Sequence, residues 1–263
     1  GPVLFEQLHP HGAGTGRADF DGGLSALDGD GGSDTKAPSL LKWMREPLMF
    51  PKIALAPYRR PVTTEPMGQG RPVLVVPGMA SGDRSTAFLR SSLAAAGYKP
   101  YAAGLGRNLT ISAVEFMALE TLLSDIVDRS DQRAILLGWS LGGFYARVLA
   151  QRHPEKVAMV LTLGTPFSGD RRDNNAWRLY ELFADHTVDH PPIHDDPATK
   201  PEAYTVAMWS PVDGVVSPRS ARGEATERDE EVEFPFRHFE MGCSRPAVKR
   251  IVELVNERIG KLH

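Results

Sequence analysis

Residues 133–150 read RAILLGWSLGGFYARVLA, and this stretch decides the fold. It begins as a short apolar run typical of a strand buried on both faces and continues with the composition of a helix. Between the two, Gly138, Ser140 and Gly142 form the pattern G-x-S-x-G, in which a serine occupies a tight, strained turn and the glycines let the strand and the helix approach. A chance match in a glycine-rich chain is the alternative, but the strand–turn–helix context favours Ser140 as a nucleophile whose Oγ projects above a sheet.

On both sides of this stretch, strand-like and helix-like segments alternate. Such alternation indicates βαβ units, in which the strands pair in parallel and the helices cover the sheet. We expect Ser85 to cap one helix and Gly97 to end it, and apolar residues from Val114 to Ile126 to face inward from the next. The sequence therefore predicts an α/β fold with a mostly parallel sheet flanked by helices, with strands over residues 72–78, 98–104, 133–139, 157–164, 203–210 and 231–236 and helices over residues 85–97, 111–127, 141–152 and 246–259.

Composition divides the chain into two parts. Residues 1–37 are dominated by Gly, Asp, Ser and Thr and offer little to bury, so we expect a flexible tail. Residues 38–263 are expected to form one domain. A polar, proline-interrupted insertion at about 168–202 breaks the alternation, and we expect it to cover the carboxyl edge of the sheet as a lid.

A short amphipathic segment opens the predicted domain. Ser39 is placed to cap a helix there. The apolar residues Leu40, Leu41, Trp43 and Met44 then form a stripe, which we expect to pack against the main domain.

Charge and cysteine content exclude several classes of protein. Thirty basic and thirty-three acidic residues give a net charge of −3, which provides no electrostatic footprint for nucleic acid or an anionic membrane. The single cysteine, Cys243, cannot form an internal disulfide.

Long apolar runs and a signal-peptide pattern are both lacking, so we expect a cytoplasmic protein without stable membrane insertion. If Gly1 and Pro2 are a scar of tag removal, a native leader could be missing.

A serine hydroxyl becomes a good nucleophile only when a base takes its proton. His238 is the candidate base, because it follows a predicted strand and precedes the last predicted helix, which places it in a loop at the carboxyl edge of the sheet. A histidine that merely lies on the surface is the alternative. The other histidines lie in the tail, in the insertion, at the end of the helix that follows Ser140, or at the end of the chain: His9, His11, His153, His186, His190, His194 and His263.

The base in turn needs an acid that fixes its tautomer and stabilises the imidazolium. Asp213 follows the strand predicted at 203–210 and comes before His238, which gives the order Ser, Asp, His. Asp170, one strand earlier, is the rival. Either aspartate could instead be a turn former.

An acyl-transfer reaction also needs two donors for the oxyanion. We expect them to be the backbone N–H of Leu141, directly after the nucleophile, and that of Met79, in the loop after the first strand. The alternative is that Met79 only packs in the hydrophobic core.

Aromatic side chains are the candidates for contact with a substrate. Trp139 and Phe239 are the neighbours in sequence of the predicted nucleophile and base. Trp177 and Tyr180 share one face of a short helix in the insertion. An apolar lid helix favours a lipophilic acyl group or alcohol over a charged substrate.

The insertion also gathers metal-ligand residue types. However, Pro191 and Pro192 prevent one helix from presenting His186, His190 and His194 on a single face. We therefore expect a solvated lid and no metal or organic cofactor.

Five motifs occur in order: VLVVPGM at 73–79, GWSLGGFYARVLA at 138–150, LTLGTPFSG at 161–169, SPVDGVVS at 210–217 and HFEMGCSRPAV at 238–248. Together they resemble the α/β-hydrolase superfamily, and especially its bacterial lipase- or esterase-like members. The resemblance covers about residues 72–259, and it implies the α/β-hydrolase fold and serine-hydrolase chemistry.

The sequence thus predicts a serine hydrolase that cleaves a small, neutral or lipophilic carboxylic ester through a Ser140, Asp213 and His238 triad. Acyl transfer, or cleavage of an amide or thioester, would use the same residues and is the first alternative. A binding protein that kept the fold without catalysis is the second. A third possibility is that the tail recruits a partner or targets the enzyme. The oligomeric state stays open.

Overall fold

The computed structural model describes residues 38–46, 54–79, 81–106, 112–169 and 195–262, all within one compact unit, Ser33–His263. The predicted flexible tail at 1–37 lies outside the described residues, as does most of the predicted insertion. Both stay predictions.

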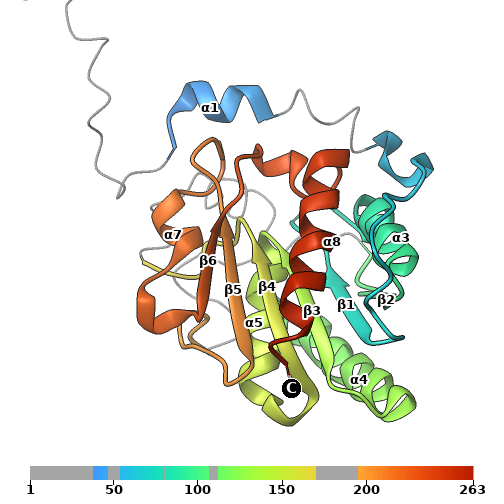
Figure 1. The fold of residues 1–263 in the computed structure, drawn as a ribbon. Helices are drawn as coiled ribbons and strands as arrows, with labels where there is room; N and C mark the ends of the chain where they lie inside the picture. The colour runs from blue at the N-terminus through green and yellow to red at the C-terminus, as the bar shows by residue number, and fades with distance from the viewer. Residues whose placement is uncertain (1–37, 47–53, 80, 107–111, 170–194, 263) are drawn as a thin grey trace, which may run out of the picture. The chain divides into compact units, whose positions relative to one another are not determined.

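A six-stranded sheet organises the described residues (Figure 1). The strand order is β2-β1-β3-β4-β5-β6, and every neighbouring pair is parallel. This confirms the predicted α/β fold with a parallel sheet. The strands are β1 (Pro72–Val76), β2 (Lys99–Ala102), β3 (Ala134–Trp139), β4 (Val157–Leu163), β5 (Tyr204–Trp209) and β6 (Glu230–Glu233).

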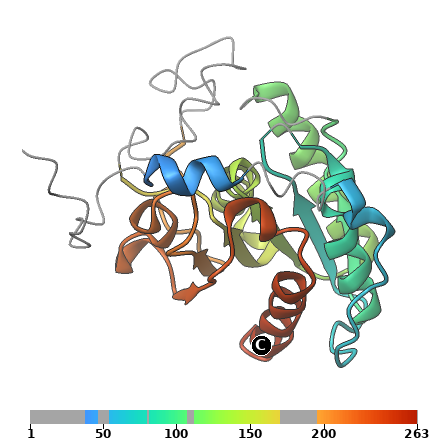
Figure 2. The same cartoon turned by 90° about the horizontal axis from the view of Figure 1, so that it is seen from above.

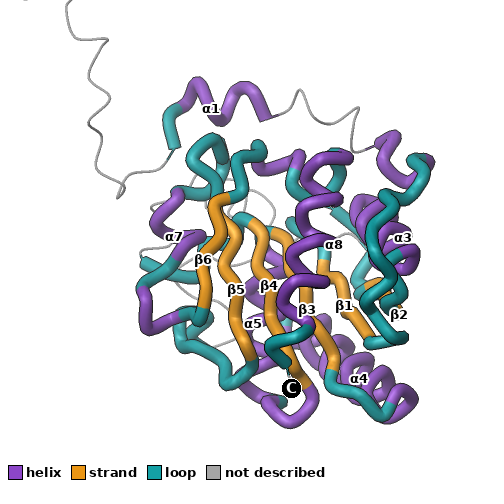
Figure 3. The backbone as a smooth tube through the Cα atoms, in the orientation of Figure 1, coloured by secondary structure: helices purple, strands orange, loops and turns teal. Residues whose placement is uncertain are grey.

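Helices cover both faces of this sheet, as Figure 2 and Figure 3 show from two sides. On one face, α3 (Ala87–Ala95) and α8 (Arg245–Ile259) bury their apolar residues against alternate residues of the strands. On the other, α4 (Ala113–Ser130) and α5 (Leu141–Arg152) do the same with the intervening strand residues. Because strand side chains alternate between faces, a strand that is apolar throughout requires these two layers.

Short helices and turns complete the described structure. They are α1 (Leu40–Arg45), η2 (Ala56–Tyr58), η3 (Asp83–Thr86), η4 (Pro154–Lys156), α7 (Pro218–Arg222), η6 (Ala225–Glu227) and η7 (His238–Glu240). Among the helices that the structure describes, none combines the length and the apolar composition needed to cross a membrane.

Three details of the predicted elements are wrong. The helix expected at 85–97 begins with the turn η3, so Ser85 does not cap α3, and its hydroxyl bonds the Gly82 carbonyl instead (2.8 Å). Val114 is 71% exposed, because it lies in the first turn of α4, on the side away from the sheet. The last strand ends at Glu233 rather than at 236, since Pro235 has no N–H with which to continue the ladder.

The segment at the start of the domain forms the predicted helix, α1, with Ser39 accepting a bond from the Lys42 amide. Trp43 is half-buried and packs on a small cluster that includes Val215 and Val216. Leu41 and Met44, however, are 75% and 66% exposed. The prediction that the whole stripe packs inward is therefore wrong for these two residues.

Candidate active site

The predicted nucleophile lies in the turn between β3 and α5. Ser140 has φ 53° and ψ −120°, a left-handed conformation that a residue with a Cβ rarely adopts. Its amide donates to the Leu163 carbonyl (2.8 Å), and its carbonyl accepts from the Gly143 amide (3.0 Å). These two bonds hold the strained residue between the end of β4 and the first turn of α5.

Close approach of the backbone explains the glycines on each side of Ser140. A Cβ on Gly138 would lie 2.3 Å from the Cα of Gly143, and one on Gly142 would lie 2.2 Å from the Val76 carbonyl oxygen. Neither obstacle is a flexible side chain. The G-x-S-x-G spacing is therefore a requirement for packing the strand–turn–helix unit.

Asp213 and His238 form a buried pair at the edge where β5 and β6 end. His238 Nδ1 lies 2.8 Å from Asp213 Oδ2, and each residue is 2% exposed. The other carboxylate oxygen, Oδ1, accepts the amides of Val215 (2.7 Å) and Val216 (2.8 Å). Three bonds therefore fix the Asp213 carboxylate, which in turn fixes the orientation of the imidazole ring.

Two opposing effects act on the pKa of His238. Burial lowers it, but the charge of Asp213, the hydrogen bond to Asp213 and the charge of Glu46 raise it, and the net result is a pKa above the ordinary value of 6.5. The pair therefore stabilises the imidazolium that a general base becomes when it takes a proton.

Trp139 joins the turn of Ser140 to the loop of His238. The Trp139 indole N–H donates to the His238 carbonyl (3.2 Å), and the two rings lie 6.3 Å apart between centroids. At the end of β4, a Cβ on Gly164 would approach Asp213 Oδ2 to 3.0 Å and His238 Nδ1 to 3.2 Å. Ser140, Asp213 and His238 thus gather at one edge of the sheet, around the ends of β3, β4 and β5.

The loop after β1 passes beside the nucleophile. A Cβ on Gly78 would lie 3.3 Å from the Cβ of Ser140, and the Ser81 hydroxyl donates to the Gly78 carbonyl (2.7 Å), which closes a tight turn. Met79 follows Gly78 in this turn, and Leu141 opens α5. Both predicted oxyanion donors therefore belong to segments that adjoin Ser140.

The predicted substrate contacts divide into three cases. Trp139 is buried beneath the His238 loop, where it supports that loop, and its contact with substrate stays a prediction. Phe239 is half-buried, with its ring perpendicular to that of His238 at 5.5 Å. Trp177 and Tyr180 lie outside the described residues.

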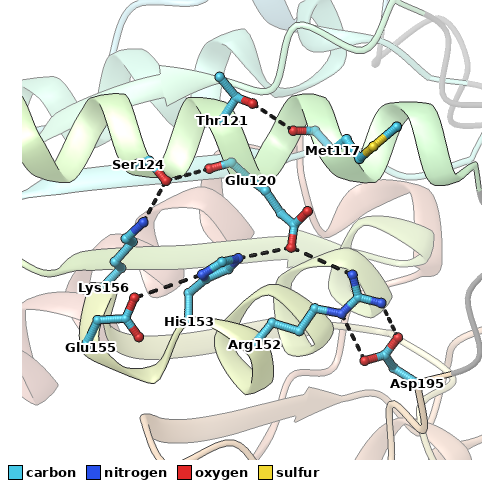
Figure 4. A network of polar contacts seen from close by, with 9 residues as sticks. All are labelled: Met117, Glu120, Thr121, Ser124, Arg152, His153, Glu155, Lys156 and Asp195. Carbon is cyan, nitrogen blue, oxygen red and sulfur yellow. Dashed lines mark hydrogen bonds and ion pairs between the residues drawn. The ribbon is translucent and has the colours of Figure 1, made fainter.

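Among the rivals considered, His153 is the one that the structure describes. It lies at the C-terminal end of α5, away from Ser140, with its Nε2 atom 3.0 Å from Glu120 (Figure 4). The rival acid Asp170 and the three histidines of the insertion lie outside the described residues. Within the described part of the chain, acidic, histidine and cysteine side chains form no group that could hold a metal ion.

Sequence reasoning missed one buried carboxylate of the site, Glu46. It directly follows α1 and accepts hydrogen bonds from the backbone amides of Gly214, His238 and Phe239. Burial raises the pKa of Glu46, while the charge of His238 and the N–H donors act in the opposite direction. A glutamate after a short helix carries no local signal of this role, because its partners lie far away in the sequence.

Comparisons with known sequences agree with this architecture. A sequence model of the alpha/beta hydrolase fold matches residues 73–193. The biotin biosynthesis bifunctional protein BioHC of Teredinibacter turnerae is 45% identical over 47 residues, which are 18% of this chain and 8% of that protein. The pimeloyl-[acyl-carrier protein] methyl ester esterase of Citrobacter koseri is 36% identical over 62 residues, 24% of this chain and 23% of that protein. The matches thus span less than a quarter of the length of these relatives.

Solved structures resemble the chain over a longer range. A pyrethroid hydrolase from Sphingobium faniae gives a TM-score of 0.51 at 19% identity and covers 72% of this chain and 97% of its own. A monoacylglycerol lipase from Paleococcus ferrophilus gives a TM-score of 0.53 at 14% identity, and the match covers 76% of this chain and 97% of the lipase. A soluble variant of the monoglyceride lipase from Saccharomyces cerevisiae gives a TM-score of 0.55 at 13% identity, and the match covers 77% of this chain and 90% of the lipase. At identities this low, the likeness concerns the fold.

Proposed function

We propose that this chain, which has the α/β-hydrolase fold, is a serine hydrolase that cleaves carboxylic esters through an acyl-enzyme. The observation that carries the proposal is the buried His238–Asp213 hydrogen bond at the sheet edge where Ser140 occupies a strained turn. A nucleophile, a base and an orienting acid on separate loops at one edge are the parts that ester cleavage requires.

In the proposed reaction, Ser140 Oγ attacks the ester carbonyl while His238 takes its proton. Asp213 holds Nδ1 of the ring and stabilises the resulting imidazolium. The backbone N–H groups of Leu141 and Met79 are the proposed donors to the oxyanion. His238 then gives its proton to the departing alcohol, which leaves Ser140 acylated. A water molecule, deprotonated by His238, attacks the acyl group and releases the acid and the free serine.

A neutral or lipophilic ester is the proposed class of substrate. The net charge of −3 provides no attraction for a polyanion. One relative by sequence is named for an ester substrate, a pimeloyl-carrier methyl ester. The aromatic residues Trp177 and Tyr180 of the insertion are the proposed contacts for an apolar acyl group or alcohol.

A fluorophosphonate probe tests the nucleophile directly. We expect it to label the wild-type protein at Ser140 and to leave Ser140→Ala unlabelled. The variant Ser124→Ala, which removes a hydroxyl on α4 that accepts a bond from Lys156, is the matched control and should label like wild type. A probe that labels Ser140→Ala as strongly as wild type would refute the proposal.

The bond that is cleaved is tested with a set of substrates. We expect hydrolysis of p-nitrophenyl esters, with the rate depending on acyl chain length, to exceed hydrolysis of matched amides and thioesters. If an added alcohol or amine acceptor captures most of the acyl group in preference to water, the enzyme is an acyltransferase and the ester-hydrolase proposal is wrong.

A further inference from the structure

A buried carboxylate joins the two loops that carry the proposed acid and base. Glu46 is 1% exposed. Its Oε1 atom accepts the amide of Gly214 (2.9 Å), next to Asp213, and the amide of His238 (3.0 Å). Its Oε2 atom accepts the amide of Phe239 (3.1 Å). One side chain therefore bonds the loop after β5 and the loop after β6 at the same time.

Two costs oppose a glutamate at this place. A carboxylate loses its hydration when it is buried, and the C-terminal end of a helix, where Glu46 lies, disfavours negative charge. Three N–H donors offset these costs by satisfying both oxygens. The partners are backbone amides, so the bonds fix the course of both loops.

Helix α1 is held against the same loop by other contacts, which keep Glu46 in place. The Lys42 ammonium donates to the Pro211 carbonyl (3.0 Å). A Cβ on Gly214 would lie 2.5 Å from the Lys42 carbonyl oxygen, so the helix and the loop pass in direct contact there. Trp43 packs with Val215 and Val216. Figure 2 shows α1 near the η7 turn that contains His238.

We propose that Glu46 is a positioning residue of the enzyme, whose carboxylate holds the Asp213 and His238 loops in register so that the acid and the base stay hydrogen-bonded. The inference rests on the proposed serine-hydrolase function, because it assigns a role to a residue that supports that site. Glu46 acts through Asp213 and His238 and takes no part in bond making.

The charge of Glu46 gives this role a measurable signature. Among the residues that the structure describes, the ionisable groups that act on the His238 ring are Asp213 and Glu46, both of which raise its pKa. The Lys42 ammonium lies on the outer side of the loop at Pro211, and Glu240 bonds the Arg237 amide at the edge of η7. Removal of the Glu46 charge should therefore lower the pKa of His238. Loss of a residue that only supported the loops structurally would leave this pKa unchanged.

The test compares Glu46→Gln with Glu120→Gln. Glutamine keeps one carbonyl oxygen for the amides of Gly214 and His238 but loses the charge and the acceptor for Phe239. Glu120→Gln makes the same chemical change at a partly exposed carboxylate of α4, which contacts His153 and Arg152 away from Ser140, so it serves as the matched control. Thermal unfolding first establishes that both variants are folded.

In Glu46→Gln we expect kcat for a p-nitrophenyl ester to fall on the order of 10- to 100-fold, with a smaller change in KM, because a displaced His238 takes the proton of Ser140 less effectively. We also expect the acid limb of the kcat/KM profile to move to lower pH. Glu120→Gln should keep kcat within about twofold of wild type and leave the acid limb in place. A Glu46→Gln enzyme with unchanged kcat and an unchanged acid limb overturns the inference.

An NMR titration of the His238 imidazole, assigned by comparison with His238→Gln, gives a readout that does not depend on activity. We expect a lower His238 pKa in Glu46→Gln than in wild type. An equal His238 pKa in both proteins contradicts the proposed role of Glu46, even if the wild type hydrolyses no ester. If fluorophosphonate does not label the wild type, but the His238 pKa is lower in Glu46→Gln than in wild type, the serine-hydrolase proposal is refuted. The coupling between Glu46 and His238 is then kept.

Discussion

Two histidine–carboxylate pairs with similar atomic contacts lie in different regions of this molecule. His238 Nδ1 and Asp213 Oδ2 are 2.8 Å apart, and the two side chains are 3% and 1% exposed. His153 Nε2 and Glu120 Oε1 are 3.0 Å apart, but these side chains are 24% and 26% exposed. Distance alone would rank the two pairs as equals, and their surroundings separate them.

The neighbours of each pair show the difference. Glu120 also contacts Arg152, which in turn forms an ion pair with Asp195, and His153 lies 3.9 Å from Glu155 (Figure 4). This is a network of partly exposed side chains. By contrast, the oxygens of Asp213 bond buried groups, namely the His238 ring and the amides of Val215 and Val216. Interactions between charges weaken with hydration, so the buried pair can impose a geometry that the surface pair cannot.

The largest expected effect comes from removing each histidine in turn. His238→Gln should lower kcat for a p-nitrophenyl ester on the order of 10⁴-fold, because Ser140 then has no base. His153→Gln should keep kcat within about twofold, because it removes only one member of a surface network. Steady-state kinetics on the two purified variants gives the answer. If both variants lose activity to the same extent, the contrast between the two pairs is wrong.

The two carboxylates should also differ in their contribution to stability. Asp213→Ala leaves the buried His238 ring and the amides of Val215 and Val216 without their acceptor, so we expect the free energy of unfolding to fall by about 3–5 kcal/mol. Glu120→Ala should cost about 1 kcal/mol or less. Urea denaturation followed by circular dichroism measures both. An equal loss in the two variants would contradict the difference in burial.

The pH dependence sharpens the comparison further. The proposed base works only when it is neutral, and Asp213 and Glu46 raise the pKa of His238 above 6.5 despite burial. We therefore expect kcat/KM to rise with pH, with its midpoint above 6.5, and His153→Gln to leave that midpoint in place. A profile that is flat from about pH 5 to 9 would exclude His238 as the base.

The same shift has an effect on stability whose sign follows from linkage. A group whose pKa is raised on folding binds more protons in the native state, so its stabilising contribution is present below the unfolded pKa and is lost as the pH rises through the folded one. The unfolding free energy of wild type minus that of His238→Gln should therefore decrease as the pH rises above 6.5. A difference that grows with pH would reverse the sign and contradict the raised pKa.

The smallest expected effect is the coupling within the surface pair. A double-mutant cycle with His153→Gln and Glu120→Gln should give a coupling energy of about 0–1 kcal/mol, and 0.5 M NaCl should reduce it. A coupling above about 2 kcal/mol that is insensitive to salt would make the surface pair equivalent to the buried one.

Much of the fold could be predicted because the central strands of the sheet are apolar on both faces. Such runs at β1, β3 and β4 identify a covered parallel sheet without knowledge of their partners. Helix faces were harder, since periodicity identifies an apolar stripe without showing whether a neighbour covers it. Leu41, Met44 and Val114 therefore belong to predicted stripes and yet face away from the core.

The candidate site was predictable where chemistry restricts the order of residues, as for Ser140, Asp213 and His238. Glu46 was not, because its partners Gly214 and His238 are 168 and 192 positions away, and no local pattern records such a contact. Trp177 and Tyr180 stay predictions, because they lie outside the residues that the structure describes.

The strand order has a consequence for the newly made chain. The proposed nucleophile follows β3, in the interior of the sheet, whereas the acid and the base follow β5 and β6, which are made last and complete the edge of the sheet. Synthesis proceeds from the N-terminus, so a nascent chain contains the serine well before its activating residues. Ser140 should consequently remain unreactive on the ribosome, and reactivity toward an acylating probe would report the moment at which the last strand has docked.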